Sequence, residues 1–169
     1  MTVMIHPAGW STYDVQGGTL AEVAQHIAHM QEAAQTHWHP TYQVTQWGEG
    51  NHIVTTSVDV QIAVTMPHWA GASSRPQAEQ DEWTRFIDAL HGHEQGHIDL
   101  AHQYLEHADT LVQGTDEHTA AQQWQDNLNA LQQASDSYDS SNDHGRNAGT
   151  TITLPDDAST NESESEATP

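Results

Sequence analysis

The chain has 169 residues, which is enough for one domain with a hydrophobic core and too few for two. It carries 24 acidic residues against three basic ones, so its formal net charge is −21. This balance excludes the basic patch that nucleic acids and anionic membranes require of a partner. Cysteine is absent, so any metal ion must be held by histidine and carboxylate side chains.

The acidic, lysine-free composition is typical of proteins adapted to high salt, where screening weakens the repulsion between like charges. A disordered acidic chain would carry the same charge, but six tryptophans, four tyrosines and regular apolar spacing favour a folded body. No apolar run is long enough to cross a membrane, and the sequence starts without the pattern of a secretory signal peptide. We therefore expect a soluble, salt-adapted domain without membrane insertion, and the sequence indicates no particular oligomeric state.

The N-terminal half predicts one helix and one hairpin. Residues 1–18 contain turn signals and are expected to be irregular. A helix is expected to begin after Thr19 and to end near Pro40. Residues 41–47 and 52–66 alternate apolar and polar side chains, which predicts two strands joined by the glycine-containing turn between them.

The C-terminal half predicts two helices and a tail. Apolar residues recur with helical spacing over residues 81–113, and a further helix is expected from Thr115 through Leu131. The sequence from Ser135 to residue 154 predicts a loop with a short last strand. We therefore expect one domain over residues 1–154 and a disordered acidic tail over residues 155–169.

His93, Glu94 and His97 have the spacing H-E-x-x-H. On a helix, positions i and i+4 share one face, so both imidazoles can bind one Zn²⁺ at about 2.0–2.1 Å. Glu94 would then lie beside the metal, where it can take a proton from a zinc-bound water. The chain has 14 histidines, so the spacing could arise by chance, but its place between the core positions Leu90 and Ile98 favours a metal site.

A hydrolytic zinc site needs a third protein ligand and one open position. His144 is our prediction for that ligand, because it follows a helix long enough to return the chain and Gly145 frees the backbone beside it. Glu106, Asp139 and Asp143 remain as oxygen-ligand alternatives, and the two aspartates could instead accept hydrogen bonds from ligating histidines.

Four stretches of the sequence resemble the bacterial family known as domain of unknown function 922, whose members are regarded as secreted zinc-dependent proteases. The resemblance implies a zincin-like fold, a bound zinc ion and secretion. The chain departs from the family pattern at Asn142, where the family has threonine. The four stretches are YDVQGGTL at Tyr13–Leu20, MPHW at Met66–Trp69, HEQGH at His93–His97 and YDSSNDHGRNAG at Tyr138–Gly149.

Together these features predict a small α+β, zincin-like metallopeptidase domain with a twisted, mostly antiparallel sheet, a long helix bearing the H-E-x-x-H sequence and a further C-terminal helix. We expect a zinc endopeptidase acting on protein or peptide substrates, with Glu94 as general base. Tyr138 or Arg146 would stabilise the developing oxyanion, although a structural salt bridge is an equally good role for the arginine. Val58–Met66 is the strand expected at the rim of the cleft, where it would pair with an extended substrate. The alternative is a catalytically silent metal-binding or interaction module, which would gain nothing from Glu94.

Overall fold

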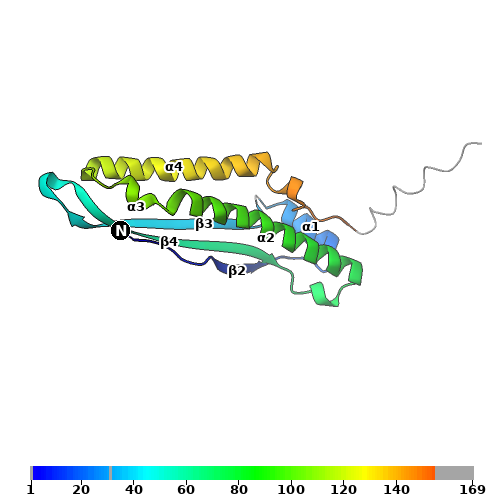
Figure 1. The fold of residues 1–169 in the computed structure, drawn as a ribbon. Helices are drawn as coiled ribbons and strands as arrows, with labels where there is room; N and C mark the ends of the chain where they lie inside the picture. The colour runs from blue at the N-terminus through cyan, green and yellow to red at the C-terminus, as the bar shows by residue number, and fades with distance from the viewer. Residues whose placement is uncertain (1, 31, 155–169) are drawn as a thin grey trace, which may run out of the picture.

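Helices cover one face of a four-stranded sheet in the computed structural model, which describes residues 2–30 and 32–154 (Figure 1). The strands are β1 (Thr2–Ile5), β2 (Gly9–Asp14), β3 (Gln35–Trp47) and β4 (Ile53–His68). The helices are α1 (Leu20–Ala28), α2 (Gln77–Leu105), α3 (Ala108–Leu111) and α4 (Glu117–Ser141), with 3₁₀ turns at Glu49–Asn51, Ala72–Ser74 and Arg146–Ala148. The α+β class is therefore as predicted.

The central strand of the sheet is β4. It pairs antiparallel with β3 on one side, and with β1 and then β2, both parallel to it, on the other. The sheet is thus mixed, and the predicted mostly antiparallel arrangement is wrong. Residues 1–18 were expected to be irregular, yet β1 and β2 lie end to end along one edge of β4. Their short runs, separated by Pro7, carry too little alternation to be recognised without the neighbouring strand.

The predicted hairpin between β3 and β4 is confirmed, but β3 begins earlier than expected. It starts at Gln35, so α1 ends at Ala28 and does not continue toward Pro40. Thr36 and Trp38 face the helices, and this packing favours a strand over the helix that local spacing suggested. Proline is tolerated in β3 because the strand lies at the edge of the sheet.

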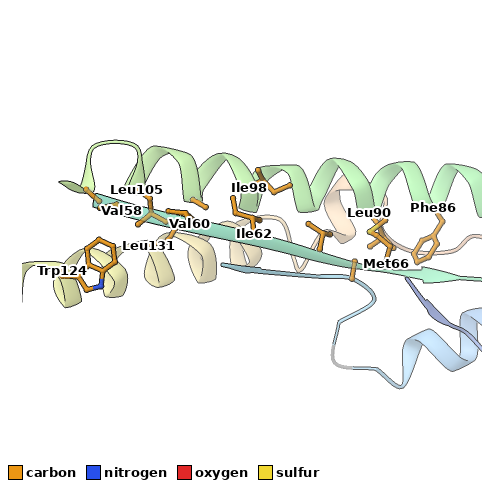
Figure 2. Packing of buried hydrophobic residues seen from close by; sticks show 14 of the residues in the cluster. Val58, Val60, Ile62, Met66, Phe86, Leu90, Ile98, Leu105, Trp124 and Leu131 are labelled. Carbon is orange, nitrogen blue, oxygen red and sulfur yellow. The ribbon is translucent and has the colours of Figure 1, made fainter. Parts of the chain in front are cut away.

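The hydrophobic core lies between the sheet and α2 (Figure 2). Alternate residues of β4, including Val58, Val60 and Ile62, are at most 4% exposed and point toward the helices. On α2, Phe86 and Leu105 are completely buried, as the helical spacing predicts. The long helix ends at Leu105 and the chain turns into the short α3, so the predicted helix over residues 81–113 is divided in two.

The second long helix, α4, runs antiparallel to α2 and packs against it (Figure 1). It begins after Asp116, whose side chain accepts a hydrogen bond from the backbone N–H of Thr119. It continues to Ser141, although the sequence predicted a loop from Ser135. Serine and aspartate are weak helix formers, so packing against α2 outweighs their local preference. No strand follows α4 in the described part of the chain.

The described residues end at Leu154, so the predicted disordered tail over residues 155–169 lies outside them. The proposed boundary between domain and tail therefore stays a prediction. None of the helices in the described ranges combines the length and the apolar character that crossing a membrane would require.

Candidate metal centre

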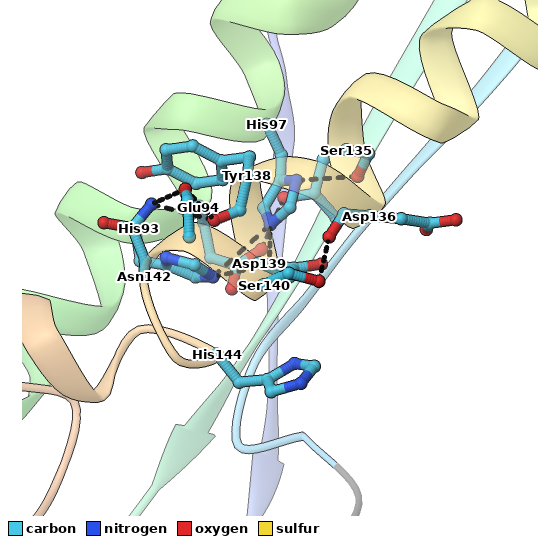
Figure 3. A network of polar contacts seen from close by, with 12 residues as sticks. His93, Glu94, His97, Ser135, Asp136, Tyr138, Asp139, Ser140, Asn142 and His144 are labelled. Carbon is cyan, nitrogen blue, oxygen red and sulfur yellow. Dashed lines mark hydrogen bonds and ion pairs between the residues drawn. The ribbon is translucent and has the colours of Figure 1, made fainter.

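The two histidines of the H-E-x-x-H sequence lie one turn apart on α2 and face α4 (Figure 3). His93 and His97 are each 7% exposed, and their Nε2 atoms lie 3.4 Å apart. Burial lowers the pKa of His93, and the positive charge that His97 can carry acts in the same direction. A neutral imidazole at physiological pH is the form that binds a metal ion.

The third member of this group is Asp139 of α4. Its Oδ1 atom lies 3.1 Å from Nε2 of His93 and 3.0 Å from Nε2 of His97. A tetrahedral zinc site with bonds of about 2.0–2.2 Å has ligand atoms about 3.3–3.5 Å apart, close to the separations found here. Among the residues that the structure describes, these three form the one such group of histidine, aspartate or glutamate side chains. Their donor atoms and spacing fit a zinc ion.

Ser135 controls the orientation of one ligand. Its Oγ atom lies 2.9 Å from Nδ1 of His97, one turn before Asp139 on the same helix (Figure 3). When Nδ1–H of His97 donates to Ser135, the lone pair on Nε2 faces Asp139, as metal binding requires. The corresponding Nδ1 atom of His93 is buried and has no hydrogen-bond partner among the described residues, where only one of the two imidazoles has this support.

Glu94 lies beside the group without belonging to it. Its side chain is buried, and Thr36 Oγ1–H of β3 donates a 2.7 Å hydrogen bond to its Oε2 atom. Burial raises the pKa of Glu94, and the hydrogen bond from Thr36 opposes this rise. The sequence does not indicate Thr36, because local spacing predicts the first helix over this segment and the contact joins residues far apart in the chain.

Tyr138 packs against both histidines from the side of Gly96. Its ring stacks on His93, with centroids 5.1 Å apart and an interplanar angle of 20°, and meets His97 edge-on at 5.1 Å. A Cβ atom on Gly96 would overlap both the ring and the hydroxyl group of Tyr138. Tyr138 is not among the described residues that line the cavity below, and its role as an oxyanion stabiliser stays a prediction. Its ring contacts both imidazoles.

The structure does not bring His144 into the group of ligands. The backbone at Asp143, His144 and Gly145 has φ angles of 48°, 51° and 82°, so the chain turns sharply after α4. Because α4 extends two turns further than predicted, Asp139 is the third member of the group and His144 lies beyond it (Figure 3). Glu106, at the C-terminal end of α2, also lies outside the group.

A cavity of about 650 Å³ adjoins the group and is lined by α1, β3, α2, α4 and residues 144–152. His93, Glu94 and Asp139 all contribute to its wall. Residues 32–38 line it consecutively. Since successive side chains of a strand point to opposite faces, this run means that the edge of β3 borders the cavity.

The strand at the rim is therefore β3, and the expectation that Val58–Met66 would form the rim is wrong. That segment belongs to β4, which has partners on both sides and no free edge there. The sequence could not distinguish the two strands, because apolar alternation identifies a strand but does not give its order in the sheet.

Among known families, the profile of "Bacterial protein of unknown function (DUF922)" matches residues 10–145. The chain belongs to this family. The matched part of this DUF922 chain includes the group of His93, His97 and Asp139 together with Glu94 and His144, and it ends just before Arg146. Searches among curated proteins and among solved structures find no match. Membership supports the predicted resemblance without assigning a reaction.

Proposed function

We propose that this DUF922 protein is a zinc-dependent endopeptidase in which His93, His97 and Asp139 hold the metal ion. The observation that carries the proposal is the position of Glu94. It is a buried carboxylate on the cavity wall, adjacent to the three ligand atoms and hydrogen-bonded by Thr36, outside the ligand group itself. A site that only stores or displays a metal has no use for such a group.

Zinc bound at this position would activate a water molecule and polarise the carbonyl group of the scissile peptide bond. Glu94 would accept a proton from the attacking water and pass it to the leaving amine. The hydrogen bond from Thr36 holds one carboxylate oxygen, so the other stays free for the proton. Ser135 would keep His97 in the tautomer that binds metal, and Tyr138 would fix the planes of both imidazoles.

The edge of β3 supports a peptide as the substrate. Edge strands present unpaired backbone N–H and C=O groups, which can form hydrogen bonds with an extended chain. The edge borders the cavity at Gln35–Trp38, next to Glu94, so a peptide paired there would pass the metal-binding group. Ile27 and Ile152, two partly exposed residues that line the same cavity, offer apolar surface for a side chain of the substrate.

The test compares the parent protein with Glu94→Gln and with a control, Glu106→Gln, which makes the same chemical change on an exposed residue at the C-terminal end of the same helix. Each protein is purified without a histidine tag, its zinc content is measured, and cleavage of casein is followed with and without a chelator. We expect Glu94→Gln to keep about one zinc ion while cleavage falls by a factor of about 10² or more. The control should match the parent.

Two outcomes would contradict the proposal in different ways. If Glu94→Gln cleaves casein as fast as the parent, Glu94 is not the general base. If the zinc-loaded parent cleaves no peptide under any condition, the alternative of a catalytically silent metal-binding module replaces the enzyme.

A further inference from the structure

Arg146 is exposed on the cavity wall, and among residues 2–30 and 32–154 it has no close carboxylate partner. Its side chain is 71% exposed, and the nearest carboxylate oxygen, on Asp143, lies 3.9 Å away. Such a separation between exposed groups gives a weak ion pair. The guanidinium group therefore keeps its donors available for a ligand in the cavity.

The other two cations of the chain have structural partners. Arg75, which precedes α2, lies 3.2 Å from a carboxylate oxygen of Glu79 in the first turn of that helix. Arg85 lies 2.7 Å from Glu82 and also donates hydrogen bonds to backbone carbonyl groups of the C-terminal segment. Within the part of the chain that the structure describes, Arg146 is thus the one arginine without a short ion pair.

The loop that carries Arg146 is fixed in an uncommon conformation. Asp143 and His144 both have left-handed backbone angles, which residues other than glycine rarely adopt. Two backbone hydrogen bonds hold the turn. The N–H of His144 donates to the carbonyl oxygen of Asp139 at 2.7 Å, and the N–H of Arg146 donates to the carbonyl oxygen of Asp143 at 3.1 Å. The side chain of Thr150 packs where a Cβ on Gly145 would lie, which closes the loop further. The backbone therefore holds Arg146 at a defined position on the cavity wall.

We propose that Arg146 binds a carboxylate of the substrate, so that the site prefers peptides carrying a carboxylate near the scissile bond. This inference rests on the proposed peptidase function. A guanidinium group donates two parallel hydrogen bonds to a carboxylate, which gives both attraction and orientation. The C-terminal carboxylate of a peptide and an acidic side chain offer the same chemistry, and the experiment separates them.

The test measures binding of one fluorescent pentapeptide in four forms. Its C-terminus is either the free acid or the amide, and the residue after the central position is either glutamate or glutamine. The proteins carry zinc and Glu94→Gln to prevent turnover, either alone or together with Arg146→Gln, Arg146→Lys or Gln123→Glu. The last variant also lowers the net charge by one unit, but at an exposed position of α4 outside the cavity.

We expect one carboxylate form to bind about three- to tenfold more tightly than its neutral counterpart at about 0.1 M salt. Arg146→Gln should remove this preference, Arg146→Lys should keep part of it, and Gln123→Glu should leave it unchanged. A preference for the free acid identifies the C-terminal carboxylate, and a preference for glutamate identifies an acidic side chain.

Equal binding of all four peptides, undetectable binding of all four, or a preference that survives Arg146→Gln would overturn the inference. Failure of the proposed function is a separate result, because it appears as a lack of cleavage by the parent protein and does not depend on the ratio between the peptides.

Discussion

Replacing Gly96 with alanine tests whether Tyr138 positions the metal ligands. At an ordinary site inside a helix, glycine to alanine stabilises the protein by about 1 kcal/mol. Here the added Cβ would overlap the ring and the hydroxyl group of Tyr138. The ring cannot move freely, because it stacks on His93 and meets His97 edge-on. Overpacking of this kind costs about 1–3 kcal/mol, and the fixed ring puts it near the upper value. We therefore expect Gly96→Ala to destabilise the protein by about 2 kcal/mol.

Gly92 provides the matched control on the same helix. A Cβ there would have nothing within 4 Å, so Gly92→Ala should stabilise the protein by about 1 kcal/mol. In a Tyr138→Ala background the obstacle is gone, and Gly96→Ala should then be stabilising as well. The two substitutions at Gly96 and Tyr138 should thus show a coupling energy of about 3 kcal/mol in a double-mutant cycle.

The assay is urea unfolding of the metal-free variants followed by tryptophan fluorescence, with zinc affinity measured in parallel. Gly96→Ala should also weaken zinc binding, since displacement of Tyr138 moves the imidazoles that it packs against. If Gly96→Ala stabilises the protein as much as Gly92→Ala does, Tyr138 does not lie against Gly96, and its positioning role is refuted.

Three further predictions concern the ionisation of Glu94, the hydrogen bond between Ser135 and His97, and the net negative charge of the chain. Burial raises the folded-state pKa of Glu94, so its ionisation costs stability only as the pH rises through that pKa. Glu94→Gln should therefore raise the melting temperature of the metal-free protein at about pH 8 and leave it unchanged at about pH 4, and an equal gain at both would contradict the assignment. Ser135→Ala should weaken zinc affinity by about 10–100-fold, because the hydrogen bond that orients His97 is lost. Ser137→Ala, on the exposed side of α4, should leave zinc affinity unchanged. Equal affinities of the two variants in a zinc titration would refute the role of Ser135. The melting temperature of the parent protein should rise as KCl increases from about 0.1 M to about 1 M, because the Debye length falls from about 10 Å to about 3 Å. A melting temperature that stays constant or falls over this range would contradict adaptation to high salt.

Sequence analysis predicted those features that depend on residues close together in the chain. The helical spacing around His93 and His97 predicted α2 and the shared face of its two imidazoles. The glycine-containing turn before β4 predicted the hairpin. In each case the local preference and the tertiary structure agree, so a short segment was sufficient.

Asp139 was not predicted as the third member of the group, because its location depends on where a helix ends. A loop from Ser135 would leave His144 free to reach the metal. The helix continues to Ser141, and Asp139 then projects toward α2 one turn after Ser135. Contacts with α2 stabilise these residues as a helix, and their own propensities do not reveal such contacts.

Local sequence patterns also do not predict the order of the strands in the sheet. Apolar alternation shows that one face of a strand is buried, but β3 and β4 share this feature. Only the pairing of β1 and β2 with β4 leaves β3 at the edge, where Thr36 meets Glu94. The contact between β3 and Glu94 therefore depends on the whole sheet.

A crystal structure of the zinc-loaded protein, with the metal located by its anomalous scattering, tests the central claim most directly. We predict one zinc ion bound by Nε2 of His93 and His97 at about 2.0–2.1 Å and by a carboxylate oxygen of Asp139 at about 2.0–2.2 Å, with Glu94 adjacent and unbound. A site without zinc, or a zinc ion bound by His144 in place of Asp139, would contradict the account.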